Sequence, residues 1–315
     1  MTDAPLRLGT RASALALWQA RHVAAAIARI PGAPPVEIVE IKTTGDAVTD
    51  IPLWATAGKG FFTAELDRAL IDQRIDLAVH SLKDLPTAPG DNLVITAVLE
   101  REDPRDALVV GKGLDPNALP RGASIGTSSL RRRAFVARWR PDLVHRDLRG
   151  NVPTRLSKLD DGAYDAIVLA AAGLKRLGLA ARIASYLPME TFPPAVAQGA
   201  IAVMTRSNDS RTIRWISALD HPVTRIAVRA ERALLRHVEG GCQVPLGAHG
   251  HITGDTLKLS AEVCSLDGTF TVAAENQGPI SEPEKLGIAV AEALLRGDAR
   301  RALATMPVLT IKSAP

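Results

Sequence analysis

Cysteine is scarce in this sequence, with two residues among 315. Two cysteines are too few for a disulfide framework. The fold must therefore depend on buried apolar cores. No segment reaches the roughly 18 unbroken apolar residues that a membrane-spanning helix needs. The start, MTDAPLRLGT, also lacks the basic and apolar regions of a signal peptide. These absences predict a cytoplasmic protein with no membrane partner.

Aromatic residues are also rare, at 3% of the chain, although the net charge is +4. Proteins that bind single-stranded nucleic acid stack bases on aromatic side chains, and the arginines here are dispersed rather than gathered in one helix or tail. There is no GxxxxGK(S/T) phosphate loop, and His249 and His251 lack the companion ligands of a metal site. We therefore expect neither a nucleic-acid partner nor a metal.

The first 220 residues alternate β-branched runs with amphipathic stretches, a pattern typical of α/β domains with mainly parallel sheets. A chain of this length can form two or three domains. The predicted strands are Leu6–Leu8, Val36–Lys42, Asp76–His80, Leu93–Val98, Ala107–Val110, Ser124–Gly126, Leu143–Arg146 and Ala166–Ala170. The predicted helices are Ala14–Ile30, Thr63–Gln73, Leu130–Trp139 and Pro153–Asp160.

Two segments, Glu100–Pro104 and Pro193–Gly199, are predicted to cross between the α/β halves, so the chain leaves the first half and returns to it. After about Asp220 the pattern changes to that of a smaller α+β domain. Its predicted elements are Ala227–His237, Thr256–Ser265, Thr269–Glu275 and Pro283–Leu295. We predict domain 1 at residues 1–100 with 200–219, domain 2 at 101–199 and the C-terminal domain at 220–315.

Three consecutive arginines, Arg131–Arg133, begin the predicted helix that Ser129 caps. A helix N-terminus already presents positive charge, and guanidinium groups bind carboxylate or phosphate through paired hydrogen bonds. With the hydroxyls of Thr127 and Ser128, these residues form a candidate anion site. The alternative is that the long side chains extend into solvent and hold no ligand.

The same arrangement recurs at other predicted strand ends. The residues concerned are Arg11, Ser13, Arg149, Arg155, Lys175 and Arg176. Ligands of open α/β sheets bind at the carboxyl ends of the strands, so these cations should lie together. One large polyanion fits them better than several unrelated surface patches.

The segment HSLKDLP, His80–Pro86, follows an apolar strand and places Lys83 and Asp84 on the loop at its carboxyl end. An aspartate there can point into a cleft between domains. The alternative is an ordinary surface pair of opposite charges. His80 is interpreted as structural, because its neighbours continue the strand.

The two cysteines lie in different settings. Cys264 falls in the alternating strand LSAEVCSLDG, whereas Cys242 falls in the loop segment GGCQVP. Only the loop position has the backbone freedom and access that a reactive thiol needs, although many loop cysteines are inert. His237 and His249 do not stand at a spacing typical of a Cys–His nucleophile.

Seven segments, in order along the chain, carry a resemblance to one enzyme family. They are RASALALWQ (Arg11–Gln19), HSLKDLPT (His80–Thr87), EREDPRDALV (Glu100–Val109), GTSSLRRRA (Gly126–Ala134), LRGNVPTRLSKL (Leu148–Leu159), AGLKRLG (Ala172–Gly178) and EGGCQVPLGA (Glu239–Ala248). Through these motifs the chain closely resembles the porphobilinogen deaminases, also called hydroxymethylbilane synthases, from about residue 6 to residue 250.

The resemblance implies a transferase of tetrapyrrole and haem biosynthesis, with two domains similar to type II periplasmic binding proteins around an active cleft and a smaller third domain. Such enzymes condense four porphobilinogen molecules head to tail, with release of ammonia, into hydroxymethylbilane. They do so on a dipyrromethane cofactor that a thioether joins to a cysteine, which matches Cys242 here. Each pyrrole carries an acetate and a propionate, and this supplies the polyanion that the arginines predict.

In this resemblance Asp84 matches the family's catalytic aspartate, which contacts pyrrole N–H groups, assists loss of the aminomethyl nitrogen and stabilises the cationic azafulvene. Independently of the resemblance, the glycines of Gly58-Lys59-Gly60 ahead of Phe61-Phe62 predict a flexible hinge or lid, with Lys59 and Phe62 as its candidates. The positions that match residues binding cofactor or substrate are Arg11, Ser13, Ser81, Lys83, Thr127, Ser128, Ser129, Arg131, Arg132, Arg149, Arg155, Arg176, Gln198 and Gly199. Two departures are Ala197, where family members often have glycine, and Thr44, where some have arginine.

The resemblance also implies a monomer, and no heptad pattern or large apolar stripe in the sequence contradicts this. The main alternative is a noncatalytic anion-binding protein of the same two-lobed design. That alternative explains neither Asp84 nor Cys242.

Overall fold

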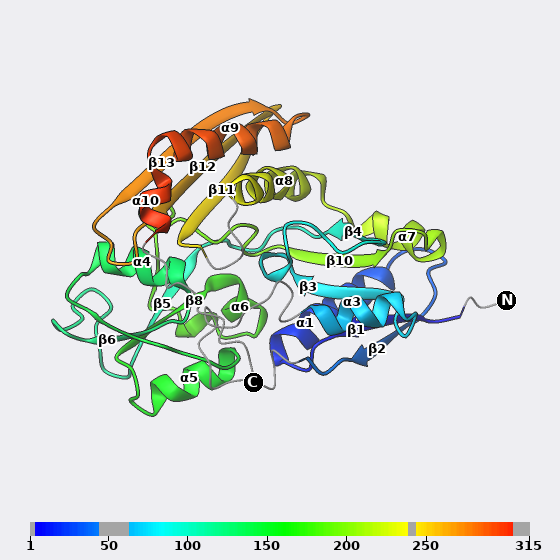
Figure 1. The fold of residues 1–315 in the computed structure, drawn as a ribbon. Coiled ribbons are helices and arrows are strands. Elements are labelled where there is room, and N and C mark those ends of the chain that lie inside the picture. The colour runs from blue at the N-terminus through cyan, green and yellow to red at the C-terminus, as the bar shows by residue number, and fades with distance from the viewer. Residues whose placement is uncertain (1–3, 44–62, 239–243, 305–315) are drawn as a thin grey trace, which may run out of the picture.

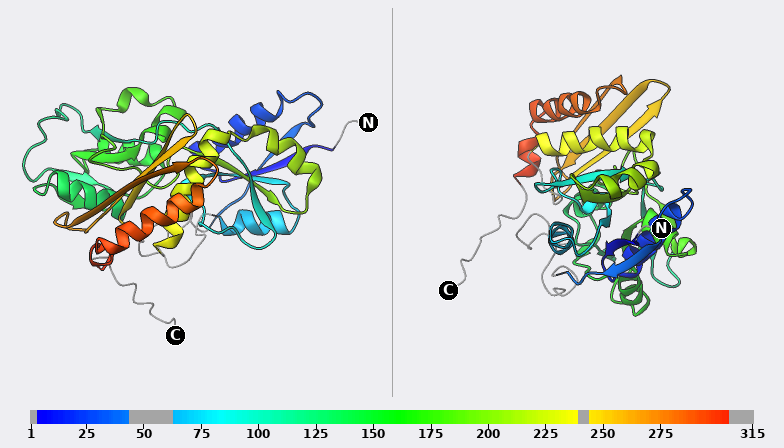
Figure 2. Two further views of the ribbon diagram at one scale, coloured as in Figure 1. Left: turned by 90° about the horizontal axis from the view of Figure 1, so that it is seen from above. Right: turned by 90° about the vertical axis from the view of Figure 1, so that its right-hand side faces the viewer.

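Three β-sheets form the framework of the computed structural model, which describes residues 4–43, 63–238 and 244–304 (Figure 1). Two sheets have five strands each and lie side by side, and a three-stranded sheet with its helices lies across both (Figure 2). The predicted fold class is confirmed: two α/β domains and a smaller C-terminal α+β domain. None of the described helices combines the length and apolar character that crossing a bilayer requires.

The first sheet has the strand order β2-β1-β3-β10-β4. Its strands are β1 (Leu6–Thr10), β2 (Val36–Glu40), β3 (Leu77–Ser81), β4 (Leu93–Val98) and β10 (Ile201–Arg206). The first three pair in parallel, and β10 returns antiparallel between β3 and β4. Successive residues of β3 point to opposite faces, so Leu77 packs under helix α1 (Ala14–Ile27) and Ala78 under α3 (Ala64–Ile71). Helix α7 (Ser210–Ile216) joins the α1 side.

The second sheet has the order β7-β6-β8-β5-β9. Its strands are β5 (Asp106–Val110), β6 (Ser124–Gly126), β7 (Val144–Arg146), β8 (Ala166–Ala170) and β9 (Ser185–Tyr186). The strand β6 pairs in parallel with β7 and β8, whereas β5 is antiparallel to β8. Val168 packs against helix α4 (Leu130–Trp139) and Ile167 against α5 (Val152–Asp160), so these helices cover opposite faces. A short helix, α6 (Ala171–Arg176), follows β8 directly.

The C-terminal domain packs three helices against a three-stranded antiparallel sheet around one core. Its elements are α8 (Pro222–His237), β11 (Leu246–Thr253), β12 (Thr256–Cys264), β13 (Thr271–Pro279), α9 (Pro283–Arg296) and α10 (Ala299–Leu303). Leu257 and Leu259 point inward and Lys258 outward, as the alternating pattern predicts. Helices α8 and α9 approach so closely that a Cβ on Gly287 would lie 2.3 Å from the carbonyl oxygen of Ala230.

The two crossing segments meet the C-terminal domain at Glu231, a fully buried residue of α8. Its carboxylate forms an ion pair with Arg101 of the first crossing, at 2.6 Å between Nη1 and Oε1. It also accepts hydrogen bonds from the backbone N–H of Ala197, in the second crossing, at 2.7 Å and from that of Gly250, on β11, at 2.8 Å. One carboxylate therefore joins both crossings to the third sheet.

The second crossing contains two residues with positive φ, at the first and third of three consecutive positions. Ala197 has φ +59°, which explains why glycine suits this position, and Gly199 has φ +91°. A Cβ on Gly199 would lie 2.2 Å from the carbonyl oxygen of Glu102 in the first crossing. The two crossings are thus in direct backbone contact.

Alanine at Gly199 should lower the free energy of unfolding by about 2–4 kcal/mol, because the strained backbone and the contact with Glu102 add together. Urea titration measures this loss. Gly162→Ala is the matched control: φ there is +77°, but a Cβ would meet nothing within 4 Å, so we expect only the backbone cost of about 1–2 kcal/mol. Equal losses in the two variants would show that the crossings are not tightly packed.

Candidate functional site

The predicted site residues gather where parallel strands end. Arg11 follows β1, the 3₁₀ turn Leu82–Asp84 follows β3, and Ser129 caps α4 after β6. Arg155 lies on α5 after β7, and Arg176 ends α6 after β8. Because the carboxyl ends of parallel strands meet at one sheet edge, cations from both α/β domains face the same region.

A small cavity of about 70 Å³ lies at the end of β3. Its walls include Arg11, Ser13, Gln19, His80, Ser81 and Asp84. Gln19 donates a hydrogen bond from Nε2 to Ser81 Oγ at 2.9 Å. The Asp84 carboxylate is exposed and accepts no hydrogen bond from the described residues. It is therefore available to a ligand.

His80, interpreted from the sequence as structural, is a buried residue that also contributes to the lining of this cavity. It is 5% exposed, and burial together with the charge of Arg11 lowers its pKa to about 4. The imidazole is therefore neutral, and within the described ranges its Nε2 has no hydrogen-bond partner. The strand pattern alone could not distinguish this position from an ordinary core residue.

The first turn of α4 places two buried arginines on one internal carboxylate, Asp106. Arg131 Nη2 lies 2.5 Å from Asp106 Oδ2, and Arg132 Nη2 lies 2.8 Å from Oδ1. Burial alone would raise the pKa of Asp106, but the two guanidinium groups lower it to about 2. Arg133 is exposed, so only two of the three arginines point inward.

The hydroxyl groups of the three residues before α4 form hydrogen bonds with backbone groups. Ser129 Oγ accepts the N–H of Arg132 at 3.4 Å, which is the predicted cap. Thr127 Oγ1 accepts the N–H of Ser129 at 3.2 Å, and Ser128 Oγ donates to the carbonyl oxygen of Leu148 at 2.9 Å. Ser13 similarly caps α1. These contacts fix the loops that carry the arginines.

Lys83 and Arg155 have lowered pKa values, because burial and neighbouring positive charges destabilise their charged forms. Burial and the charge of Arg132 lower the pKa of Lys83 to about 8, although Asp84 raises it. Burial and repulsion from Arg132 and Arg149 lower the pKa of Arg155 to about 10. Within the described ranges Arg155 has no ion pair, and its Nε donates to the carbonyl oxygen of Gly150 at 2.7 Å. An added anion would relieve both groups.

The second crossing contacts two of the predicted cations, Arg176 and Lys83. Arg176 Nη2 donates to the carbonyl oxygen of Gly199 at 2.6 Å, and burial lowers the pKa of Arg176 to about 10. Gln198 is 1% exposed, and its Oε1 accepts from Lys83 Nζ at 3.2 Å. The crossing thus contacts cations of both α/β domains.

The structure describes one of the two cysteines, Cys264. Cys264 is buried, and burial raises the pKa of its thiol to about 11, so it is not reactive. Cys242, Lys59, Phe62 and Thr44 lie outside the described residues. Among the described residues no cluster of His, Cys, Asp and Glu is arranged to hold a metal ion.

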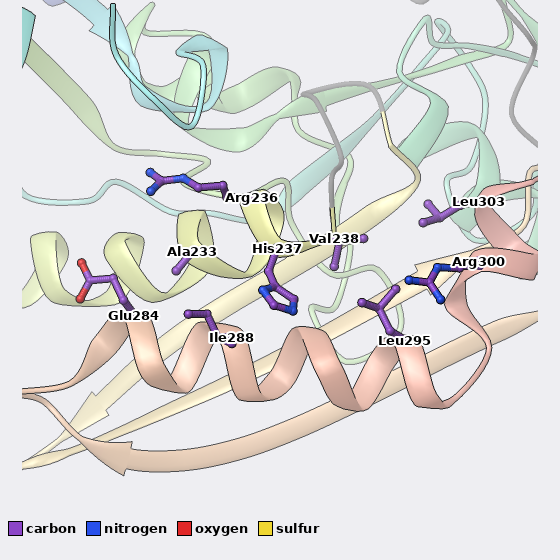
Figure 3. Close-up of a pocket in the computed structure, with 9 residues that line it drawn as sticks. All are labelled: Ala233, Arg236, His237, Val238, Glu284, Ile288, Leu295, Arg300 and Leu303. Carbon is purple, nitrogen blue, oxygen red and sulfur yellow. The ribbon is translucent and has the colours of Figure 1, made fainter. Parts of the chain in front are cut away.

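A larger hollow of about 500 Å³ lies between α8 and α9 (Figure 3). Its lining consists of Ala233, Arg236, His237, Val238, Glu284, Ile288, Leu295, Arg300 and Leu303. It shares no lining residue with the small cavity, and Glu284 in its wall already pairs with Arg229 at 2.6 Å. The candidate site is therefore at the strand ends.

Comparison with known proteins identifies the family. The model "Porphobilinogen deaminase, dipyromethane cofactor binding domain" matches residues 6–214, and "Porphobilinogen deaminase, C-terminal domain" matches residues 225–296. The chain belongs to the porphobilinogen deaminase family. Because the family is one of enzymes, the noncatalytic anion-binding alternative is not favoured. The model that matches residues 6–214 is that of a domain that binds the dipyrromethane cofactor.

Two relatives match almost the whole chain. The porphobilinogen deaminase of Geobacter metallireducens is 50% identical over 305 residues, which cover 96% of this chain and 95% of that one. The porphobilinogen deaminase of Geobacter sulfurreducens is 49% identical over 300 residues, covering 95% and 94%. Among solved structures, a periplasmic substrate-binding protein of an ABC transporter from Coxiella burnetii is 16% identical, with TM-score 0.44, over 70% of this chain and 94% of that chain.

The sequence did not single out Asp106 as a site residue, although it lies inside the quoted segment EREDPRDALV. The available indication was a carboxylate at the start of an apolar strand, where burial demands an ion-pair partner. Gln19 likewise closes the quoted segment RASALALWQ and is 2% exposed. The available indication for Gln19 was a polar residue on the buried face of the predicted helix Ala14–Ile30.

Proposed function

We propose that this chain condenses porphobilinogen head to tail, releases ammonia at each step and forms the linear tetrapyrrole hydroxymethylbilane. The observation that carries the proposal is the excess of positive charge around one exposed carboxylate: Lys83, Arg132 and Arg155 repel one another beside Asp84. Each substrate ring brings an acetate and a propionate. Binding of successive rings would relieve the repulsion while Asp84 faces the reacting centre.

The residues present fit a dipyrromethane, whose rings carry carboxylates of the same kind. Arg131 Nε and His80 Nε2 are buried and have no hydrogen-bond partner among the described residues, so each could receive one from a bound group. We propose that Lys83, Arg131 and Arg132 hold the carboxylates of this cofactor. When bound, it supplies the free pyrrole position to which the first substrate ring is joined.

In this proposal Asp84 accepts hydrogen bonds from the pyrrole N–H of the substrate. Its negative charge also stabilises the positive charge that develops on the ring as ammonia leaves. Arg11 shares its cavity, and Arg155 lies close enough for the charge of Asp84 to raise its pKa. These two arginines can hold ring carboxylates while Asp84 contacts the same ring.

Cys242 is the proposed attachment point of the cofactor. The chain has two cysteines, and the other, Cys264, has a buried thiol with a pKa raised to about 11 by that burial. A thioether requires a thiolate that the incoming group can reach. The loop segment EGGCQVPLGA, which resembles the cofactor loop of the family, supports Cys242 as that thiolate.

Intact-mass spectrometry tests the attachment. The wild-type protein should exceed the mass of its chain by one dipyrromethane, whereas Cys242→Ser should have the mass of the chain alone and should not turn over porphobilinogen. Cys264→Ala is the matched control and should keep both the added mass and the activity. Active wild-type protein with an unmodified mass would refute the anchor. Modified protein that releases no ammonia from porphobilinogen would refute the activity.

We also propose the domain division stated from the sequence, residues 1–100 with 200–219, 101–199 and 220–315. The return of β10 and α7 to the first sheet supports it. One copy of the chain supplies cations from both five-stranded sheets to the site, which supports a monomer as the functional unit. The small number of cysteines is consistent with the cytoplasm.

A further inference from the structure

Asp106 contacts more than the two arginines of α4. Gln198 Nε2 donates a hydrogen bond to Asp106 Oδ1 at 3.0 Å, and the same oxygen accepts from Arg132 Nε and Nη2 at 3.0 and 2.8 Å. The Oδ2 atom accepts from Arg131 at 2.5 Å. A fully buried carboxylate in the second sheet therefore accepts four hydrogen bonds from three side chains, two of them on α4 and one in the second crossing.

The Gln198 side chain has one possible orientation in this network. Its Oε1 accepts from Lys83 Nζ at 3.2 Å, and its Nε2 donates to the carbonyl oxygen of Pro104 at 2.8 Å as well as to Asp106. An amide nitrogen has two hydrogens, and both are used, so a flipped amide would lose all three contacts. The backbone is also held, because Arg101 Nε donates to the carbonyl oxygen of Gln198 at 2.8 Å.

We infer that Asp106 is a positioning residue of the active site: it fixes Arg131 and Arg132 directly, and through Gln198 it orients the ammonium group of Lys83 from the other α/β domain. The chemistry of the bound carboxylates rests on the proposed function, whereas the network does not. A single buried charge in the second domain thereby sets the spacing between cations of both domains.

The charges that face Lys83 make this network measurable. Burial and the guanidinium groups of Arg132 and Arg131 lower the pKa of Lys83, and the carboxylates of Asp84 and Asp106 raise it, with the result at about 8. Loss of the Asp106 charge should therefore lower this pKa further, on the order of one pH unit. Loss of the Gln198 acceptor should lower it as well, because the ammonium form loses a hydrogen bond.

The test is NMR of protein with ¹³C-labelled lysines, of which the chain has nine. The signal of Lys83 is the one missing from Lys83→Arg. We expect its pKa to fall in both Asp106→Asn and Gln198→Met. All of these proteins also carry Cys242→Ser, so that no cofactor carboxylate faces Lys83 during the titration.

Asp103→Asn is the matched control. Asp103 lies three positions before Asp106 and pairs with Arg105 and Lys175, at 2.7 and 3.1 Å. This variant should lower the pKa of Lys175, which that carboxylate raises, and leave the pKa of Lys83 unchanged. A purely structural role for Asp106 would move neither lysine signal selectively.

Gln198→Met tests the inference if Asp106→Asn does not fold. In the Gln198 variant the ion pairs of Asp106 with Arg131 and Arg132 remain in place. An unchanged Lys83 pKa in folded Gln198→Met would overturn the inference. If the variants show the expected pKa falls but wild-type protein does not consume porphobilinogen, the network is supported and the proposed function is refuted. The two failures are therefore distinguishable.

Discussion

Glutamine in place of Glu231 should lower the free energy of unfolding by about 3–5 kcal/mol. The wild-type carboxylate is fully buried, and it accepts from Arg101 Nη1 and Nη2 at 2.6 and 3.2 Å and from the N–H groups of Ala197 and Gly250. Glutamine keeps the size but removes the charge, and its amide hydrogens then face other donors. Denaturant titration of the two proteins measures the loss.

Glu284→Gln provides the matched control, because Glu284 also pairs with an arginine of α8 through two hydrogen bonds, at 2.6 and 3.0 Å. The side chains of that pair are about half exposed, so its loss should cost roughly 0–1 kcal/mol. A Glu231 variant that loses no more than this control would mean that the buried ion pair does not hold the crossings to the C-terminal domain.

The gathering of the candidate site residues in one region was predictable because it depends on strand ends. Parallel strands covered on both faces form continuous apolar runs, and their ends are marked where charged or hydroxyl residues follow. The strands Leu93–Val98, Ser124–Gly126 and Ala166–Ala170 and the helix Leu130–Trp139 have the predicted bounds. The cap by Ser129 was equally predictable, since its side chain acts on a neighbour three positions away.

The partner of the arginine pair was not predictable in the same way. The sequence predicts an external anion for Arg131 and Arg132, whereas the structure brings Asp106 to both of them across 25 and 26 residues. Such a contact depends on the packing of β5 beneath α4, and no local spacing rule describes it. The ion pair with Asp106 still leaves room for an external anion, since Arg131 Nε lacks a hydrogen-bond partner among the described residues.

Local chemistry also explains two differences in the elements. Helix α8 begins at Pro222, five positions before the predicted Ala227, because proline suits the first helical position and His221 Nδ1 accepts the N–H of Thr224 at 3.3 Å. The strand β10, Ile201–Arg206, was not among the predicted strands. It pairs antiparallel with β3 and β4, and its apolar run IAVMTR, buried at five of six positions, is the local pattern that indicates a strand.

Asn in place of Asp84 should reduce the turnover of porphobilinogen by at least about a hundredfold, with little change in KM. The neutral amide keeps the size of the side chain but cannot stabilise positive charge on the substrate ring. The arginines proposed to hold the ring carboxylates, Arg11 and Arg155, remain in the variant. Steady-state assays of ammonia release give kcat and KM separately, and a loss confined to kcat identifies a contact made in the transition state.

Asp91→Asn is the control for Asp84→Asn, because Asp91 is also an exposed aspartate of the first domain but does not line the small cavity. It should have wild-type kinetics. The Asp84 variant should keep the added mass of the cofactor, so that lost turnover cannot be explained by a missing primer. A near-normal kcat would remove Asp84 from the reaction, whereas a raised KM with unchanged kcat would make it a binding residue. If Asp84 acts by stabilising charge on the ring, its replacement must lower kcat, since that charge develops only after the substrate is bound.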